Sequence, residues 1–307
     1  MKRKLYLQFS SILGFIFFLS LSYSMAQQLP LLSTQSAENF NPSIIHSDYF
    51  QNYTPTNISV RYRYQWIGLK DAPRSLISHF AHWNEDYNLL FGGSLISDQT
   101  GPTGFTGLYG KVGYGINLSD DLLLTIALRG GVVQYRVKGD ELTFLEPDDV
   151  ATEFDSKLFP DFSLGATLYF DERYYVGFSV PQVLGIDLKF NKNDNDFKIQ
   201  RVRHFHGIAG TVIPFEDASR IDLSSEVRFL QNVPLHFMGR IRYEYQKLFW
   251  VGLGVANSGE ASADIGVILN VGRDDKLLRL GYAFSNYFQE YGPAFGSTHE
   301  IGFTVSW

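Results

Sequence analysis

Apolar and polar residues alternate along much of this chain with a period of two. In residues 57–66, aliphatic and aromatic side chains occupy one parity, whereas polar side chains, including Arg61 and Arg63, occupy the other. Successive side chains of a β-strand point to opposite faces, so this segment predicts a strand with one apolar face. That face packs either on a protein core or against lipid.

The same pattern recurs to the end of the chain in segments of roughly ten residues, the length that spans a membrane as a tilted strand. We identify fourteen such segments: 57–66, 75–83, 88–98, 105–118, 121–137, 160–170, 173–183, 202–215, 220–230, 234–245, 248–256, 262–271, 276–286 and 297–307. Charged residues gather on the polar faces of two of them, namely Asp222, Glu226 and Arg228 in 220–230, and Arg240, Arg242 and Glu244 in 234–245.

The lengths of the connections between these segments distinguish a membrane barrel from a soluble β-sandwich. A soluble β-sandwich shows the same apolar–polar alternation, but it does not predict connections that alternate in length. Here every second connection is short, with no more than four residues: 84–87, 119–120, 171–172, 216–219, 246–247 and 272–275. The intervening connections include 138–159, 184–201 and 287–296. We therefore predict an all-β fold, a single transmembrane β-barrel of about 14 antiparallel strands with periplasmic short turns and both barrel ends in the periplasm.

The N-terminal residues predict export. Lys2, Arg3 and Lys4 precede an apolar run, and Ser24-Met25-Ala26 provides small residues for a signal peptidase. We expect a signal peptide over residues 1–26, cleaved before Gln27; the alternative is a membrane anchor, although the run has about half of the roughly 20 residues needed to span. Residues 27–56 show no strand pattern and predict a periplasmic or lumen-entering segment, and the barrel occupies 57–307.

Composition excludes several classes of protein. The chain has no cysteine, so it has no disulfide framework and no thiolate site. Removal of residues 1–26 leaves 32 acidic and 23 basic residues, a net charge of about −9, which disfavours a nucleic-acid ligand. The 26 Phe, 18 Tyr and 28 Gly residues suit many strands joined by turns.

The barrel prediction assigns the two faces of residues 57–66. Tyr62, Tyr64 and Trp66 face lipid and lie toward an interfacial girdle, whereas Arg61 and Arg63 point into the lumen. Because an unpaired buried charge is costly, we expect lumenal acids such as Asp222 and Glu226 to pair with these arginines. The final segment also fits, because residues 298–307 alternate and end on an aromatic residue.

Three candidate chemistries are weak. His204 and His206 lie on one face of a strand and could hold a metal with a carboxylate, but isolated pairs of this kind are commoner as lumenal residues. Ser78, His79 and His82 supply the residue types of a hydrolase, but there is no G-x-S-x-G element and a triad is defined by geometry. The acid-rich stretches 148–149 and 193–196 lack the spacing of a calcium loop. We assign no catalytic, cofactor or metal residue and expect a non-enzymatic protein.

Several short motifs occur in a fixed order along the chain. They are Asn41-Pro42; Arg63-Tyr64-Gln65-Trp66-Ile67-Gly68 followed by Ala72-Pro73; Asp98-Gln99-Thr100-Gly101-Pro102; Pro160-Asp161 with Gly165; the strand Tyr174 to Pro181; and Ser297-Thr298-His299-Glu300. In this order they resemble the motifs of the PorP/SprF family of outer-membrane proteins of Bacteroidota. The chain departs from the family pattern at Phe159, after Arg203, and by one residue in its last motif.

The resemblance implies a function as well as a fold. Proteins of this family are outer-membrane barrels of type IX secretion that support the secretion or surface attachment of large substrates such as gliding adhesins. The resemblance therefore implies as partners outer-membrane lipid, type IX secretion components and a large adhesin-like protein. A porin or small-solute transporter is the alternative. Most motif residues also have structural explanations, and Arg63 and Asp161 are the strongest candidates for a lumenal network.

Overall fold

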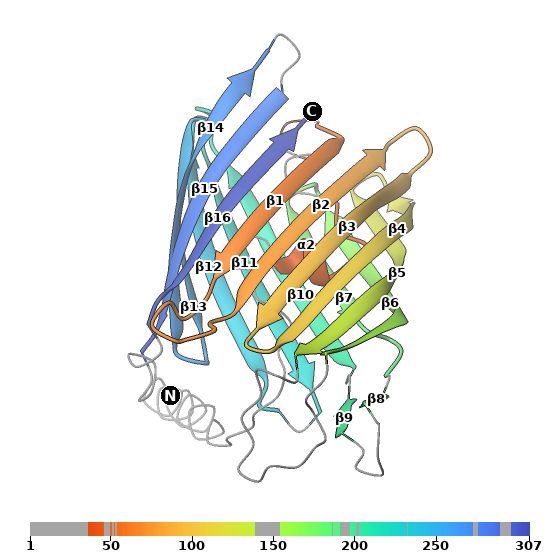
Figure 1. The fold of residues 1–307 in the computed structure, drawn as a ribbon. Helices are drawn as coiled ribbons and strands as arrows, with labels where there is room; N and C mark the ends of the chain where they lie inside the picture. Colours follow the sequence, from red (N-terminus) through yellow and green to blue (C-terminus); the bar gives the residue numbers. More distant parts are fainter. Residues whose placement is uncertain are drawn as a thin grey trace, which may run out of the picture.

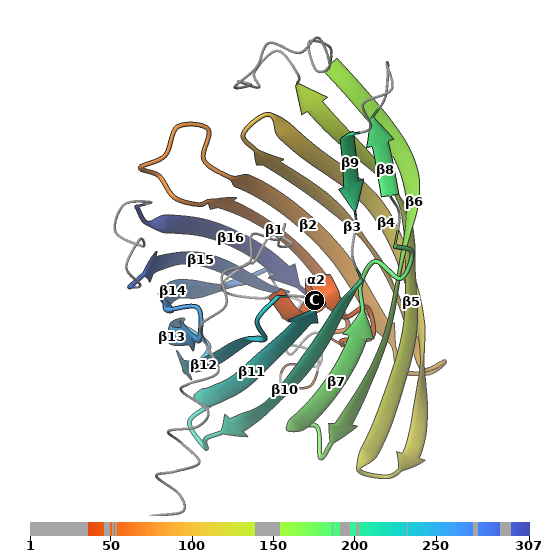
Figure 2. The same ribbon diagram turned by 90° about the horizontal axis from the view of Figure 1, so that it is seen from below.

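A closed β-barrel makes up most of the molecule (Figure 1). The computed structural model describes residues 36–45, 50, 52, 54–138, 154–185, 187–190, 197–200, 203–231, 233–272, 276–288 and 296–307. Fourteen antiparallel strands form the barrel, which confirms the predicted architecture and strand number. A short helix, α2 (Ser36–Phe40), lies inside it (Figures 1 and 2).

The barrel strands follow one another around the wall in chain order, except that β7 pairs with β10. Their bounds are β1 Thr56–Tyr64, β2 Arg74–Asn84, β3 Leu89–Thr100, β4 Thr103–Ser119, β5 Leu122–Lys138, β6 Phe154–Phe170, β7 Tyr174–Val180, β10 His204–Pro214, β11 Arg220–Leu230, β12 His236–Tyr245, β13 Phe249–Ala256, β14 Glu260–Val271, β15 Lys276–Tyr287 and β16 Thr298–Ser306. The strands β8 (Asp187–Phe190) and β9 (Phe197–Gln200) form a separate two-stranded sheet within the predicted loop 184–201.

The first and last strands close the barrel. β1 pairs with β16 from Asn57 opposite Ser306 to Tyr64 opposite His299. At the end of this seam, Thr56 and Trp307 exchange two backbone hydrogen bonds of 2.9 and 3.0 Å. Both ends of the barrel sequence thus lie at the same rim, as an even number of strands requires.

The connections at this rim are all short, and none exceeds five residues. Short turns mark the periplasmic end of an outer-membrane barrel, so we assign the opposite rim to the cell surface. The prediction of strict alternation is wrong, because the surface connections 101–102 and 257–259 are equally short. Gly101 and Gly259 have φ angles of +54° and +78°, which lets the chain reverse tightly there.

The two faces of the wall differ in polarity. Ile58, Val60 and Tyr62 on β1 are each more than a third exposed, whereas the side chains of Arg61 and Arg63 are buried inside the barrel. The apolar residues of β1 therefore face outward, toward lipid. Trp66 does not join them as predicted: β1 ends at Tyr64, Trp66 has a φ of +56°, and its ring lies 6.5 Å from that of Tyr287.

The strands around β7 are unequal in length. β7 pairs only with residues 164–170 of β6, so among the described strand pairs residues 154–163 are paired on one side only. On the other side, Phe162 O accepts a hydrogen bond of 2.8 Å from Val183 N. Residues two apart in a strand direct their backbone groups to the same side, so those of Pro160 face the same side as those of Phe162. Proline has no N–H, and at this position no strand partner is lost.

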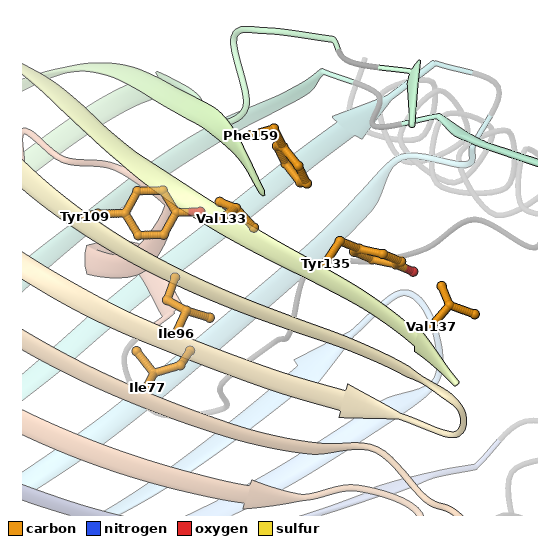
Figure 3. Packing of buried hydrophobic residues seen from close by; sticks show 7 residues of the cluster. All are labelled: Ile77, Ile96, Tyr109, Val133, Tyr135, Val137 and Phe159. Atoms are coloured by element: carbon orange, nitrogen blue, oxygen red, sulfur yellow. The ribbon is translucent and has the colours of Figure 1, made fainter. Parts of the chain in front are cut away.

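The inner surface is divided as well. Apolar side chains from β2 to β6 form a buried cluster on one wall toward the surface rim (Figure 3), composed of Ile77, Ile96, Tyr109, Val133, Tyr135, Val137 and Phe159. Paired charged residues line much of the wall from β10 through β16 to β1. Within the described part of the chain, no helix has the length and apolarity to cross a membrane.

Candidate functional site

Residues 36–45, which we call the lumenal segment, include α2, which lies inside the barrel (Figure 2). The segment contacts inward-facing side chains of the wall. Asn41 is completely buried, and its Nδ2 donates to Thr167 Oγ1 at 3.0 Å. Its Oδ1 accepts hydrogen bonds from the backbone N and the Oγ of Ser43, at 3.1 and 2.6 Å. Thr125 Oγ1 donates to Ser43 O at 2.7 Å. The segment is thus hydrogen-bonded to both β5 and β6.

Two glycines make room for this turn. Gly165 on β6 and Gly177 on β7 face inward beneath Asn41 and Pro42. A Cβ at Gly165 would overlap Asn41 Oδ1, and a Cβ at Gly177 would lie 2.7 Å from Asn41 Nδ2. Only a residue without a side chain allows the segment to approach the wall so closely.

An apolar cluster holds the C-terminal end of the lumenal segment near the periplasmic rim. Ile45 packs with Trp83, Leu90 and Tyr169, and all four side chains are almost fully buried. Its backbone N also donates to Tyr169 OH at 2.8 Å. Burial of an Ile side chain contributes roughly 1.5–3 kcal/mol, so this cluster is a substantial part of the docking energy.

The N-terminal end of the lumenal segment lies among aromatic and basic side chains. Arg129 Nη1 donates to Asn39 O at 2.5 Å, and its guanidinium lies 4.7 Å from the ring of Tyr109. Tyr109 OH in turn donates to Asp161 Oδ2 at 2.9 Å. Asp161 therefore helps to position the tyrosine on which Arg129 stacks.

Phe40 packs against a histidine and an arginine on the opposite wall. Its ring centroid lies 5.3 Å from that of His206, and the Arg228 guanidinium lies 5.0 Å above it. Glu226 joins this pair, with its Oε1 3.0 Å from His206 Nε2 and 2.5 Å from Arg228 Nη2. The lumenal segment thus bridges β5–β7 on one side and β10–β11 on the other.

Glu38 is the charged residue of the lumenal segment. Its Oε2 lies 3.6 Å from Nδ1 of the buried His79. The Glu38 carboxylate also interacts electrostatically with Arg61 and with the buried Lys111. Lys111 Nζ makes no hydrogen bond with the described residues. Because buried charges need compensation, Glu38 offsets the positive charges of Arg61 on β1 and Lys111 on β4.

The remaining charged residues of the lumen pair with one another. Arg63 Nη2 lies 3.6 Å from Oε1 of Glu260, a lumen-facing residue of β14. Glu244 accepts contacts from Arg220 and Arg279 at 3.1 and 2.7 Å. The other close pairs are Arg242 with Asp264 at 3.0 Å and Arg220 with Asp222 at 3.4 Å. These contacts lie on the wall opposite the apolar cluster.

The predicted acids contact arginines of their own strand, Asp222 with Arg220 and Glu226 with Arg228, both on β11. Arg63 instead contacts Glu260, and Arg61 donates to Thr304 Oγ1 at 3.4 Å. All eight predicted lumenal charges nevertheless occupy inward-facing positions: Arg61, Arg63, Asp222, Glu226, Arg228, Arg240, Arg242 and Glu244.

The motif residues gather in two places. Asn41, Pro42, Asp161, Gly165 and Pro181 lie around the lumenal segment. A second group lies near the surface rim, where Ile67 N donates to Ser297 O and Gly101 N donates to Asp71 O. This group comprises Arg63, Gln65, Trp66, Gly68, Asp98, Gly101, Pro102, His299 and Glu300. Pro160 belongs to neither group and faces outward.

The candidate chemistries find little support in this geometry. Ser78 and His79 are adjacent on β2 and point to opposite faces, so they cannot form a nucleophile–base pair. His206 is occupied by Glu226 and Phe40. No group of three potential metal ligands occurs among the described residues. The acid-rich stretches 148–149 and 193–196 lie outside them.

Comparison with known proteins identifies the family. A model of the "Type IX secretion system membrane protein PorP/SprF" family matches residues 24–305. The chain belongs to this family. Its barrel fold and family place it in the outer membrane. No curated protein matches the chain.

Solved structures similar to this PorP/SprF protein are outer-membrane barrels. A FadL homologue of Pseudomonas aeruginosa shares 10% identity at a TM-score of 0.50, covering 82% of this chain and 89% of its own. The CymD monoaromatic hydrocarbon channel shares 9% identity at a TM-score of 0.49, covering 85% and 92%. Omp33 of Acinetobacter baumannii shares 8% at 0.46, covering 83% and 97%. At these identities the likeness concerns the fold alone.

Several residues of the PorP/SprF lumen were not predicted from sequence. Arg129 lies in the mixed segment 121–137, and Glu38 lies in a stretch without periodicity. Glu260 precedes the predicted segment 262–271, although it is the first residue of β14. A signal was present for Lys111 and Arg129, because an isolated basic residue in an otherwise apolar strand of a barrel usually points inward.

Proposed function

We propose that this PorP/SprF protein is a closed, non-enzymatic barrel that supports the secretion or surface attachment of large substrates such as gliding adhesins. One observation carries this proposal: the lumenal segment occupies the interior and is held by both walls. A barrel filled in this way serves as a platform in the membrane rather than as an open pore. Its partners are type IX secretion components on the periplasmic side and a large adhesin-like protein on the surface.

The surface connections support a docking role. The connections 139–153, 181–203 and 288–297 are the longest of the barrel and belong to the rim opposite Thr56 and Trp307. Long surface loops of a barrel are the elements available for contact with an exported protein. The second of these connections contains its own two-stranded sheet, β8–β9.

Affinity purification tests the proposal directly. The tagged protein is isolated from its native outer membrane in mild detergent, and co-purifying proteins are identified by mass spectrometry. We expect a large secreted protein or type IX components. Recovery of the barrel alone, with a surface adhesin unaffected by deletion of the gene, contradicts the docking function.

Loop replacement then locates the contact. Replacing 139–153 with a short Gly-Ser linker avoids β6, which begins at Phe154, and a second variant replaces 187–200. We expect reduced surface adhesin with normal barrel insertion, measured by heat-modifiable mobility on gels. A third variant replaces 288–297, the remaining long surface connection, with a linker of equal length. Unchanged adhesin in all three variants argues against docking through these loops.

A cavity favours the second candidate, a small-solute channel. A space of about 140 Å³ lies between the lumenal segment and β10–β12 and reaches Glu172 and Arg173 in a periplasmic turn. Planar-bilayer conductance distinguishes the two functions. A docking barrel is silent until residues 36–45 are deleted, whereas steady conductance by the intact protein supports a channel.

A further inference from the structure

A row of outward-facing polar residues crosses the wall near the surface rim. Arg74 on β2 is directly opposite Gln99 on β3, which is opposite Gly104 on β4, and Gly104 is opposite Arg136 on β5. Neighbouring strands are about 4.8 Å apart, so the two arginines are attached to the wall about 14 Å from one another. Between them, the side chain of Gln99 lies over Gly104, and its Nε2 donates to Gly101 O at 2.6 Å.

This row begins where the lipid-facing surface ends. On β5, the outward positions from Leu124 to Val132 are apolar or Gly, a run of nine residues, and Gln134 and Arg136 follow. A tilted strand needs about 9–11 residues to cross the hydrocarbon core, so Arg136 lies at the level of lipid headgroups. On β2, the exposed Leu76 is the next outward-facing residue on the membrane side of Arg74.

The two guanidinium groups are held in place from below and from the side. Arg74 lies 4.9 Å over the ring of Tyr64, its direct neighbour on β1. Arg136 Nη2 donates to Thr106 Oγ1 at 3.1 Å, which uses one of its five N–H donors. Both groups are therefore ordered on the wall and retain donors for another molecule.

A groove extends the row at the rim. Lys70, Arg74, Gln99 and Lys138 line it, together with one carboxylate, that of Asp71. Backbone contacts hold its sides: Gly101 N donates to Asp71 O at 3.1 Å, and Lys138 N donates to Pro102 O at 2.9 Å. The patch is strongly basic on a chain whose net charge is −6.

We propose that Arg74, Gln99 and Arg136, with the adjoining groove, bind the headgroup of a phosphate-bearing glycolipid of the outer leaflet. Guanidinium groups form bidentate hydrogen bonds with phosphate oxygens, and two of them about 14 Å apart suit a headgroup with two phosphates. The apolar surface directly below, which includes Leu76, Leu95, Leu108 and Val132, receives the acyl chains. This lipid site is independent of the proposed secretion function and rests only on the outer-membrane location.

Native mass spectrometry of the full-length protein tests the site with lipid A carrying two, one or no phosphates. We expect the affinity to fall with each phosphate removed. The variant Arg74→Gln with Arg136→Gln should bind diphosphorylated lipid A at least about tenfold more weakly, since each cation near a lipid surface contributes a few-fold in affinity. The variant with lysine at both positions should fall between the two.

The control removes the same charge at the periplasmic rim, with Arg173→Gln and Lys247→Gln at exposed positions, and should bind like the wild type. Heat-modifiable mobility verifies that each variant is folded. Equal binding by the Arg74/Arg136 variant and the control overturns the site. Equal affinity for inositol hexakisphosphate, a soluble polyanion, overturns the lipid assignment, because the acyl surface would then contribute nothing.

Discussion

Gly165 lies so close to Asn41 that a Cβ at position 165 would overlap the Asn41 side chain. The two residues are far apart in sequence, and their contact joins the lumenal segment to the barrel wall. We expect Gly165→Ala to displace the segment, at a cost of about 1–3 kcal/mol for an overpacked site. Planar-bilayer conductance should then rise from silence to discrete channel openings.

Gly207→Ala is the matched control for this substitution, because a Cβ at Gly207 would touch nothing within 4 Å. It adds the same atom to a strand of the same barrel without approaching the lumenal segment. If the two variants conduct equally, the close approach of Gly165 to Asn41 does not hold the lumenal segment in place.

The hydrogen bond between Asn41 and Thr167 should couple the segment to β6 energetically. Removal of a buried hydrogen-bond partner costs about 1–3 kcal/mol, so Asn41→Ala should lower the thermal midpoint of the protein. In the double variant with Thr167→Val, the two effects should be less than additive, with a coupling of about 1 kcal/mol. Differential scanning calorimetry in detergent measures all four proteins, and strict additivity would contradict direct coupling.

Charge exchange tests the role of Glu38. Glu38→Lys places a cation among Lys111, His79 and Arg61, so the lumenal segment should leave the barrel and become accessible to trypsin. Lys111→Glu in the same chain restores an opposite pair and should restore protection. Continued cleavage in the double variant would show that the charge of Glu38 is not what holds the segment.

Glu244 should be important for the stability of the barrel rather than for keeping its lumen closed to ions. Its carboxylate contacts Arg220 and Arg279 and is almost fully buried. Glu244→Gln leaves two buried cations without their shared acid, which we expect to cost about 3–5 kcal/mol. Glu172→Gln, at an exposed turn, should cost almost nothing. Urea unfolding in lipid vesicles compares the two, with conductance unchanged in both variants.

The alternation of residues was sufficient to predict the wall of the barrel but not what fills it. In β1 the type of each side chain indicates which face of the wall it occupies, because lipid tolerates Val60 and Tyr62 but not Arg61. The contact between Arg63 and Glu260 joins β1 to β14 across two intervening strands, and no local pattern encodes it. The same holds for Asn41 and Gly165, which are recognisable as motifs but meet only after the barrel has closed.

Turns were harder to predict than strands for a physical reason. Polar residues near a surface turn can continue a strand when both neighbours extend beyond the membrane, as β4 and β5 do. The predicted strands 88–98 and 105–118 are therefore too short at the surface rim, because the hairpin closes over Gly101 and Pro102.

The lumenal segment is covalently joined to the barrel that it fills. Only residues 46–55 separate Ile45 from the first residue of β1. A tether of this length keeps a displaced segment at an effective concentration on the order of millimolar. Rebinding is then fast and independent of protein abundance, so a partner that opens the barrel must compete with a ligand that never diffuses away.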